Sequence, residues 1–85
     1  MKTFEYTITD ELGIHARPAG MLVKEAKKYQ AKITLSAKGK TVDAGKLMMI
    51  MSMGIKQGDV VMVSAEGEEE ELATAAMETF FKENL

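Results

Sequence analysis

The apolar pattern of this chain changes its period at one short stretch, residues 13–21, which reads GIHARPAGM. Before it, residues 3–8 alternate polar and apolar side chains, which is typical of a β-strand. After it, apolar residues recur at the i, i+3, i+4, i+7 spacing of one helix face; they are Ala19, Leu22, Val23 and Ala26. The chain therefore passes from strand to helix within this stretch.

The only proline of the chain, Pro18, places the start of this helix close to Ala16. A proline in the first turn loses no hydrogen bond, because the amides there have no partner inside the helix. His15, the only histidine, then lies just ahead of the first free amides. A helix N-terminus favours bound anions, and Arg17 adds donors suited to phosphate. The stretch predicts a nucleophilic histidine that carries an anion, most simply a phosphoryl group, although a helix-capping histidine beside an unrelated arginine is the alternative.

The length of 85 residues predicts one domain, residues 1–85, with a modest core. There is no cysteine, which excludes a disulfide framework and a thiolate metal site and suits a reducing cytoplasm. The longest unbroken apolar run, residues 47–51, is far too short to span a membrane. A formal net charge of -2 disfavours non-specific binding to nucleic acid. We expect a cytoplasmic protein without membrane insertion.

The remaining pattern predicts four strands and three helices. The strands are expected at residues 2–9, 31–36, 40–42 and 59–66, with a hairpin connection at 37–39, and the helices at 16–29, 46–53 and 69–84. The side chains expected to face inward from the strands are Phe4, Tyr6, Ile8, Ile33, Leu35, Val61, Val63 and Ala65, with Met62 outward. On the last helix, Leu72, Ala76 and Phe80 share one face. Strands with one wet face and helices over the other predict a two-layer α+β sandwich with an antiparallel sheet.

Residues 46–53 carry more apolar surface than a short helix can bury, because only one of its faces can lie on a sheet. We expect Ile50 and Met53 to be buried. Several of the others must then face water; the candidates are Leu47, Met48, Met49 and Met51. Exposed apolar patches tend to be docking surfaces, and methionine adapts to partners of different shape. The alternative is an irregular segment that tucks most of these methionines into the core.

The acidic run Glu68–Glu71 precedes the last helix. Negative charge stabilises the positive end of a helix. Four adjacent glutamates at a helix start point in different directions, so we interpret the run as a solvated cap rather than a metal site. No metal and no cofactor is expected.

The chain resembles, over essentially all of its length, the HPr family of histidine-containing phosphocarriers of the bacterial sugar phosphotransferase system. The resemblance is strongest at Gly13–Ala19 (GIHARPA) and extends to Gly39–Val42 (GKTV) and Met51–Gly54 (MSMG). It implies an open-faced β-sandwich, a four-stranded antiparallel sheet covered on one side by three helices in the order βαββαβα.

The resemblance also implies a function. His15 would accept a phosphoryl group through Nδ1 from phosphorylated enzyme I, which draws it from phosphoenolpyruvate, and pass it to IIA domains of sugar permeases. Arg17 would support the phosphate at the helix start formed by Ala16 and Pro18. The protein would be a monomeric carrier rather than an enzyme. The partner-docking residues implied are Gly20, Lys24, Lys27, Leu47, Met48 and Met51, which include part of the apolar patch.

One position departs from the family. Relatives in Gram-positive bacteria carry a regulatory serine at the start of the short helix, where an ATP-dependent kinase phosphorylates it, and this chain has Lys46 there. A phosphoserine would add negative charge beside the docking face, whereas lysine adds a positive one. We expect the chain to escape that kinase.

Other functions are also open. A carrier in a regulatory, non-sugar phosphotransferase branch is the nearest, and a docking regulator without phosphoryl turnover is the next, although such relatives have lost the histidine. Nucleic-acid binding on the open sheet face is disfavoured by the charge and by the lack of outward aromatic residues. A hydrolase is disfavoured because the motif offers one histidine and no acid beside it.

Overall fold

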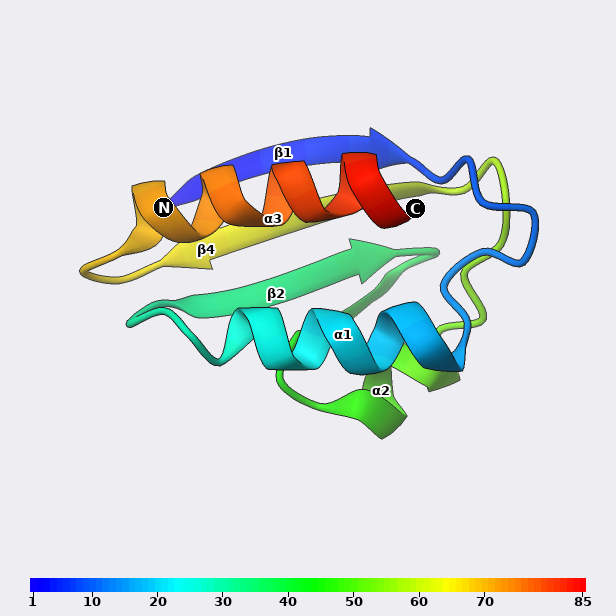
Figure 1. Cartoon of the computed structure of the whole chain (residues 1–85), viewed down its shortest axis with the longest axis horizontal. Helices are drawn as coiled ribbons and strands as arrows, with labels where there is room; N and C mark the ends of the chain where they lie inside the picture. Colours follow the sequence, from blue (N-terminus) through cyan, green and yellow to red (C-terminus); the bar gives the residue numbers. More distant parts are fainter.

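The computed structural model describes residues 1–85 and has the element order βαββαβα (Figure 1). The strands are β1 (Lys2–Thr7), β2 (Lys32–Ala37), β3 (Lys40–Asp43) and β4 (Val60–Glu66). The helices are α1 (Ala16–Ala26), α2 (Leu47–Ser52) and α3 (Glu70–Asn84). No helix combines the length and the apolar character that crossing a membrane would require.

The four strands form one antiparallel sheet in the order β1-β4-β2-β3. The central pairs bring Val63 of β4 opposite Phe4 of β1 on one side and Leu35 of β2 on the other. The period-two pattern of these strands puts their apolar side chains on one face. Leu35, Val61 and Val63 are buried there, and Met62 faces out, as predicted.

All three helices cover that same face of the sheet and leave the other face open (Figure 1). The α1 and α3 helices lie side by side over the strands, and α2 packs beside α1. One cluster of buried apolar side chains fills the space between the layers. The predicted open-faced α+β sandwich is therefore confirmed.

The first helix is shorter than the sequence suggested, since it ends at Ala26 rather than near Tyr29. The residues that follow form a turn instead of extending it, and the amide of Lys28 donates to the carbonyl oxygen of Glu25, three residues back, at 3.2 Å. The Glu25 carboxylate accepts hydrogen bonds from Lys28 Nζ at 3.0 Å and from the Tyr29 hydroxyl at 2.9 Å. The bond to Glu25 raises the pKa of Tyr29, and the bond from Lys28 lowers the pKa of Glu25. Tyr29 is half-buried against the core, so the helical spacing of apolar residues continues after the last residue of α1.

The buried face of α3 also differs from the prediction. Leu72, Ala76 and Phe80 do share one side of the helix, but Leu72 is 56% exposed there. The residues buried against the sheet and its neighbours are Ala73, Met77, Phe80 and Phe81, at the i, i+4, i+7, i+8 spacing of a helix face. The ring of Phe81 packs edge-to-face on Phe4 and Tyr6 of β1, with centroids 6.0 and 5.6 Å apart. This aromatic contact fixes the rotation of the helix, and Leu72 then falls one residue outside the buried stripe.

Candidate functional site

The loop between β1 and α1 delivers His15 to the surface, and Gly13 anchors this loop. Gly13 has a φ of +67°, and a side chain there would clash with the carbonyl oxygen of Ile55. The same oxygen accepts a hydrogen bond from the amide of Ile14 at 3.2 Å. Ile14 is buried in the core. The residue next to His15 is thus fixed by packing on one side, and the histidine is turned outward on the other.

The segment behind Gly13 is itself held by charge. The carboxylate of Asp59 accepts a hydrogen bond from the amide of Lys56 at 2.8 Å and pairs with Lys38 Nζ at 3.0 Å. These two contacts lower the pKa of Asp59, the bond from the Lys56 amide most. Lys38 also donates to the carbonyl oxygen of Gly54 at 2.8 Å. These contacts hold the segment from Gly54 to Asp59 in place, and the histidine loop packs against Ile55 of this segment.

A carboxylate that the sequence did not single out faces His15. One oxygen of Asp10 accepts a hydrogen bond from the amide of Leu12 at 2.9 Å, which closes a tight turn. The other carboxylate oxygen lies 3.7 Å from His15 Nε2. This distance suits an ion pair with a positively charged ring, and it leaves Nδ1 as the ring nitrogen turned away from the acid.

His15 occupies the N-cap position of α1 without capping it. Its backbone is extended, and its carbonyl oxygen accepts the first helical hydrogen bond, from the amide of Ala19 at 3.0 Å. Its side chain makes no cap hydrogen bond and is 36% exposed. The amides of Ala16 and Arg17 donate to no other backbone group, and Pro18 has no amide hydrogen. Two free donors therefore lie directly beside the histidine.

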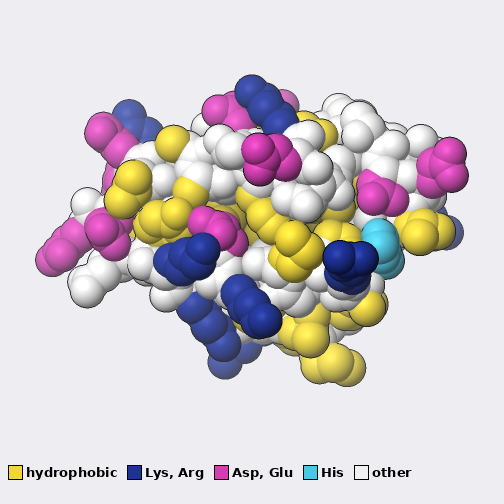
Figure 2. All heavy atoms as spheres, viewed as in Figure 1, with side chains coloured by type: hydrophobic (Ala, Val, Ile, Leu, Met, Phe, Trp, Pro, Cys, Tyr) yellow, Lys and Arg dark blue, Asp and Glu magenta, His cyan; other side chains and the backbone are white.

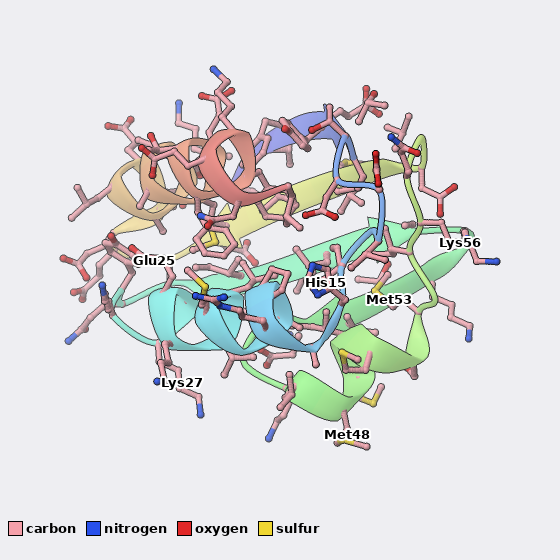
Figure 3. The ribbon with its side chains drawn as sticks, turned by 45° about the vertical axis from the view of Figure 1, so that its right-hand side comes forward. His15, Glu25, Lys27, Met48, Met53 and Lys56 are labelled. Atoms are coloured by element: carbon pink, nitrogen blue, oxygen red, sulfur yellow. The ribbon has the colours of Figure 1, made fainter.

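A shallow hollow surrounds the ring; it is lined by Asp10, His15, Arg17, Pro18, Met21 and Asn84. Arg17 is exposed and takes part in no ion pair, so its guanidinium is free for an anion. Figure 2 shows the histidine at the surface between hydrophobic and basic side chains, and Figure 3 shows it at the start of α1. Such a site can hold a small anion by charge and amide donors while leaving it open to a second molecule.

The expected apolar patch lies on α2. Ile50 and Met53 are buried, as predicted, and the four other large side chains face water; they are Leu47, Met48, Met49 and Met51. Met48 is the most exposed of them at 78% and points away from the body of the molecule in Figure 3. We refer to these four residues as the α2 patch. It is larger than the buried side of the same helix.

The two predicted docking lysines, Lys24 on α1 and Lys27 at its C-cap, are exposed and unpaired, and Gly20 leaves open space beside the helix. Lys27 lines a second hollow together with Lys46, which is the N-cap residue of α2. The fold thus brings the predicted docking residues of α1 and α2 onto neighbouring helices.

Sequence reasoning missed three residues around His15. Asp10 was not among the predicted site residues, although a carboxylate five positions before the histidine was a usable signal. Asn84 comes from the far end of the chain, and no local pattern indicates it. Met21 lies about one helical turn after Pro18, and residues at this spacing share one side of a helix. Nowhere do three or more histidine, cysteine or carboxylate groups gather as candidate metal ligands.

The chain matches, over residues 2–83, the family described as the PTS HPr component phosphorylation site. The crystal structure of HPr-C-His from Thermoanaerobacter tengcongensis is 42% identical, covers 100% of both chains and has a TM-score of 0.88. The histidine-containing phosphocarrier protein of Mycoplasma is 35% identical over 96% of this chain and 93% of that one, with a TM-score of 0.93.

A regulatory relative matches as well. The catabolite repression protein Crh of Bacillus subtilis is 30% identical over 94% of this chain and 92% of that one, with a TM-score of 0.78. Its crystal structure is described as an intertwined dimer with a swapped domain. Carriers and a regulator therefore share this fold and much of this sequence.

Proposed function

This chain belongs to the HPr family of phosphocarriers of the phosphotransferase system, and on that premise we propose that His15 is its phosphoryl acceptor. The phosphoryl group comes from phosphorylated enzyme I, and ultimately from phosphoenolpyruvate, and passes to IIA domains of sugar permeases. The observation that carries this proposal is the exposed imidazole at an uncapped helix start, with its Nε2 facing Asp10 at 3.7 Å.

The geometry supports attack by Nδ1. A new phosphorus–nitrogen bond forms there as the bond between phosphorus and the donor breaks. The ring that results has phosphorus on Nδ1 and a proton on Nε2, so it carries a positive charge. The carboxylate of Asp10 faces that edge of the ring and stabilises the charge. Asp10 keeps the ring oriented and does not act as a proton acceptor in this step.

The phosphoryl oxygens gain their stabilisation from the other side. The amides of Ala16 and Arg17 have no backbone acceptor, and the Arg17 guanidinium is unpaired. Their positive ends favour the dianion of the phosphoryl group. Since the hollow is shallow, the group stays within reach of an acceptor, as a carrier between two active sites requires.

The docking surface is the neighbouring face of α1 and α2. The α2 patch supplies apolar contact, and Lys24 and Lys27 supply positive charge for acidic partners. Methionine side chains adapt to surfaces of different shape. One face can therefore serve both the donor enzyme I and the acceptor IIA domains, with the protein acting as a cytoplasmic monomer.

The test is a labelling reaction with phosphoenolpyruvate and enzyme I, followed by intact-mass spectrometry. The wild-type protein gains one phosphoryl group, which is lost in mild acid as expected for phosphohistidine. His15→Ala gains none while its circular dichroism stays unchanged. Lys40→Ala, a surface change on β3, is labelled like the wild type. Undiminished labelling of His15→Ala would end the proposal.

The similarity to the catabolite repression protein Crh favours a regulatory function as the second candidate. The testable form of this function is phosphoryl carriage in a regulatory, non-sugar phosphotransferase branch. Phosphorylated protein separates the two when it is offered to a IIA domain of a sugar permease and to a IIA protein of a regulatory branch. Faster transfer to the sugar IIA domain supports the main proposal. Transfer only to the regulatory protein would replace it.

Lys46 bears on the same question, since it stands where the regulatory serine is found in Gram-positive relatives. The side chain is exposed at the N-cap of α2 and offers no hydroxyl. Incubation with an HPr serine kinase and ATP leaves the mass of the wild-type protein unchanged, and Lys46→Ser restores an acceptor. Stoichiometric phosphate on Ser52 or on another serine of the wild type would contradict this.

A further inference from the structure

Six of the eight methionines of this small protein are exposed. Met53 and Met77 are buried in the core, while the exposed ones are Met1, Met21, Met48, Met49, Met51 and Met62. Four of these six lie on the two helices that carry the proposed docking face, Met21 on α1 and the other three on α2. The thioether sulfur is the most easily oxidised atom that an apolar surface can present in a chain without cysteine.

The positions of these four sulfur atoms connect them to the site. Met21 lines the hollow that contains His15 and Arg17. Met48, Met49 and Met51 belong to the α2 patch, and Figure 3 shows sulfur atoms on the outer side of α2. Leucine has nearly the same volume and would supply the same apolar contact without reactive sulfur. The surface thus combines docking contact with sensitivity to oxidants.

We propose that Met21, Met48, Met49 and Met51 are sites of reversible oxidation by hydroperoxides, and that their oxidation slows phosphoryl transfer by weakening docking. A lone pair of the sulfur attacks one oxygen of hydrogen peroxide, the O–O bond breaks and an S–O bond forms. The departing hydroxide takes up the proton of the oxygen now bound to sulfur, which gives the sulfoxide and water. Sulfur loses two electrons, which reduce the peroxide. A dithiol-dependent reductase reverses the step, releasing water and a disulfide.

The effect follows from polarity. A sulfoxide places a strong dipole on a surface that must lose its water to dock, so each oxidised side chain opposes burial against a partner. The two buried methionines are protected by the fold, so the oxidised protein keeps its core. His15 itself is unchanged, and only the approach of enzyme I and of IIA domains suffers.

The experiment treats the folded protein with dilute hydrogen peroxide and maps the sulfoxides by peptide mass spectrometry. The rate of labelling by enzyme I is then measured with the protein below saturation. We expect the oxidised wild type to be labelled about tenfold more slowly, the scale at which a few docking side chains contribute. Treatment with methionine sulfoxide reductases and a dithiol restores the rate.

The structure offers a matched control. Met62 is 39% exposed on the open sheet face, and Met51 is 38% exposed in the α2 patch. Each variant is compared with its own unoxidised form, so that changes in basal rate cancel. Met62→Leu loses rate on oxidation as the wild type does. The variant with leucine at positions 21, 48, 49 and 51 keeps its rate, and an equal loss in it would overturn the inference.

This inference rests on the proposed function, and different experimental results would contradict each of them. Absence of labelling before oxidation removes the carrier function and the inference with it. Normal labelling that is insensitive to mapped sulfoxides at the four positions overturns the inference alone. Should the four-leucine variant not fold, the reductase treatment of the wild type decides, because a rate that stays low after the sulfoxides are reduced rules out a reversible effect.

Discussion

The starts of α1 and α3 are built alike and charged differently. Each helix follows a glycine that is pressed against a neighbouring loop. Gly13 lies against the carbonyl oxygen of Ile55, and a side chain at Gly67 would lie 2.9 Å from backbone atoms of Gln30 and Ala31. In both places the chain enters the helix along a path that only glycine permits.

The first turns of α1 and α3 differ in the charge that they place at the positive helix end. The first turn of α3 holds Glu70 and Glu71, and the Glu70 carboxylate accepts a hydrogen bond from the amide of Gly67 at 3.2 Å. The first turn of α1 has no acid, and its N-cap His15 makes no cap hydrogen bond. The protein therefore neutralises one positive helix end from within and leaves the other for an anion from outside.

The largest effect is expected from removing the free cation at the α1 start. Arg17→Ala slows phosphoryl transfer by roughly 10- to 100-fold, because a hydrogen bond to a charged group contributes about 1.5–3 kcal/mol. Labelling time courses with enzyme I measure this. Lys40→Ala removes an equal charge from β3, away from the hollow, and serves as the control. Equal rates for the two variants would show that Arg17 does not touch the phosphoryl group.

The next largest effect is expected from changing Gly13, which sets the backbone path into α1. Gly13→Ala destabilises the fold by roughly 1–3 kcal/mol through its positive φ, and by more where the new side chain meets Ile55. Gly58→Ala has a φ of +89° but open space around it, so it reports the backbone strain alone. Urea unfolding of both variants gives the difference. Equal losses would mean that the contact with Ile55 contributes nothing.

A smaller effect comes from making the α1 start resemble that of α3. Ala16→Glu stabilises the unphosphorylated protein by about 0.3–1 kcal/mol and slows its phosphorylation, because the new carboxylate occupies the positive helix end and repels the incoming phosphoryl group. Ala75→Glu makes the same change at an exposed position in the middle of α3. Thermal unfolding and labelling are measured for both, and a faster reaction of Ala16→Glu would refute the comparison.

The smallest effect is a pH dependence at the α3 start. A hydrogen bond from the amino group of Met1, and a second from the Gly67 amide, hold the pKa of Glu70 below its ordinary value. The carboxylate therefore stabilises the folded state above the unfolded-state pKa of about 4.5, and this contribution is lost as the pH falls through the lower folded-state pKa. The melting temperatures of wild type and Glu70→Gln differ at pH 7 and converge in acid. A difference that persists at pH 2 would contradict this assignment.

Much of the fold could be predicted from period alone, because each strand has one buried face and one wet face. The errors arose where tertiary contacts override a local pattern. The chain after Ala26 keeps its apolar spacing, yet it leaves the helix, and at Gln30 it pairs with Glu69, whose amide donates to the Gln30 carbonyl oxygen at 3.1 Å. On α3, leucine is more apolar than alanine, but the packing of Phe81 on β1 buries Ala73 and exposes Leu72.

The candidate site also has residues that the sequence predicts and residues that it does not. His15, Arg17 and the free amides are consecutive in the sequence, so proline and helix chemistry were enough to predict them. Asp10 reaches the ring only because the loop folds back through its own turn, and Asn84 arrives from the last turn of α3. Such approaches depend on how elements pack, which a linear pattern does not record.

The sheet order has a consequence for how this domain folds. The edge strand β1 pairs only with β4, which lies far along the chain at Val60–Glu66. The hairpin of β2 and β3 and the α1 helix close through short segments and can form early, whereas β1 must wait for most of the chain. Pairing of β1 with β4 is therefore expected to close the sheet last, and that same step brings the loop with Asp10 and His15 against its support. The site is complete only once the first and last strands of the sheet have met.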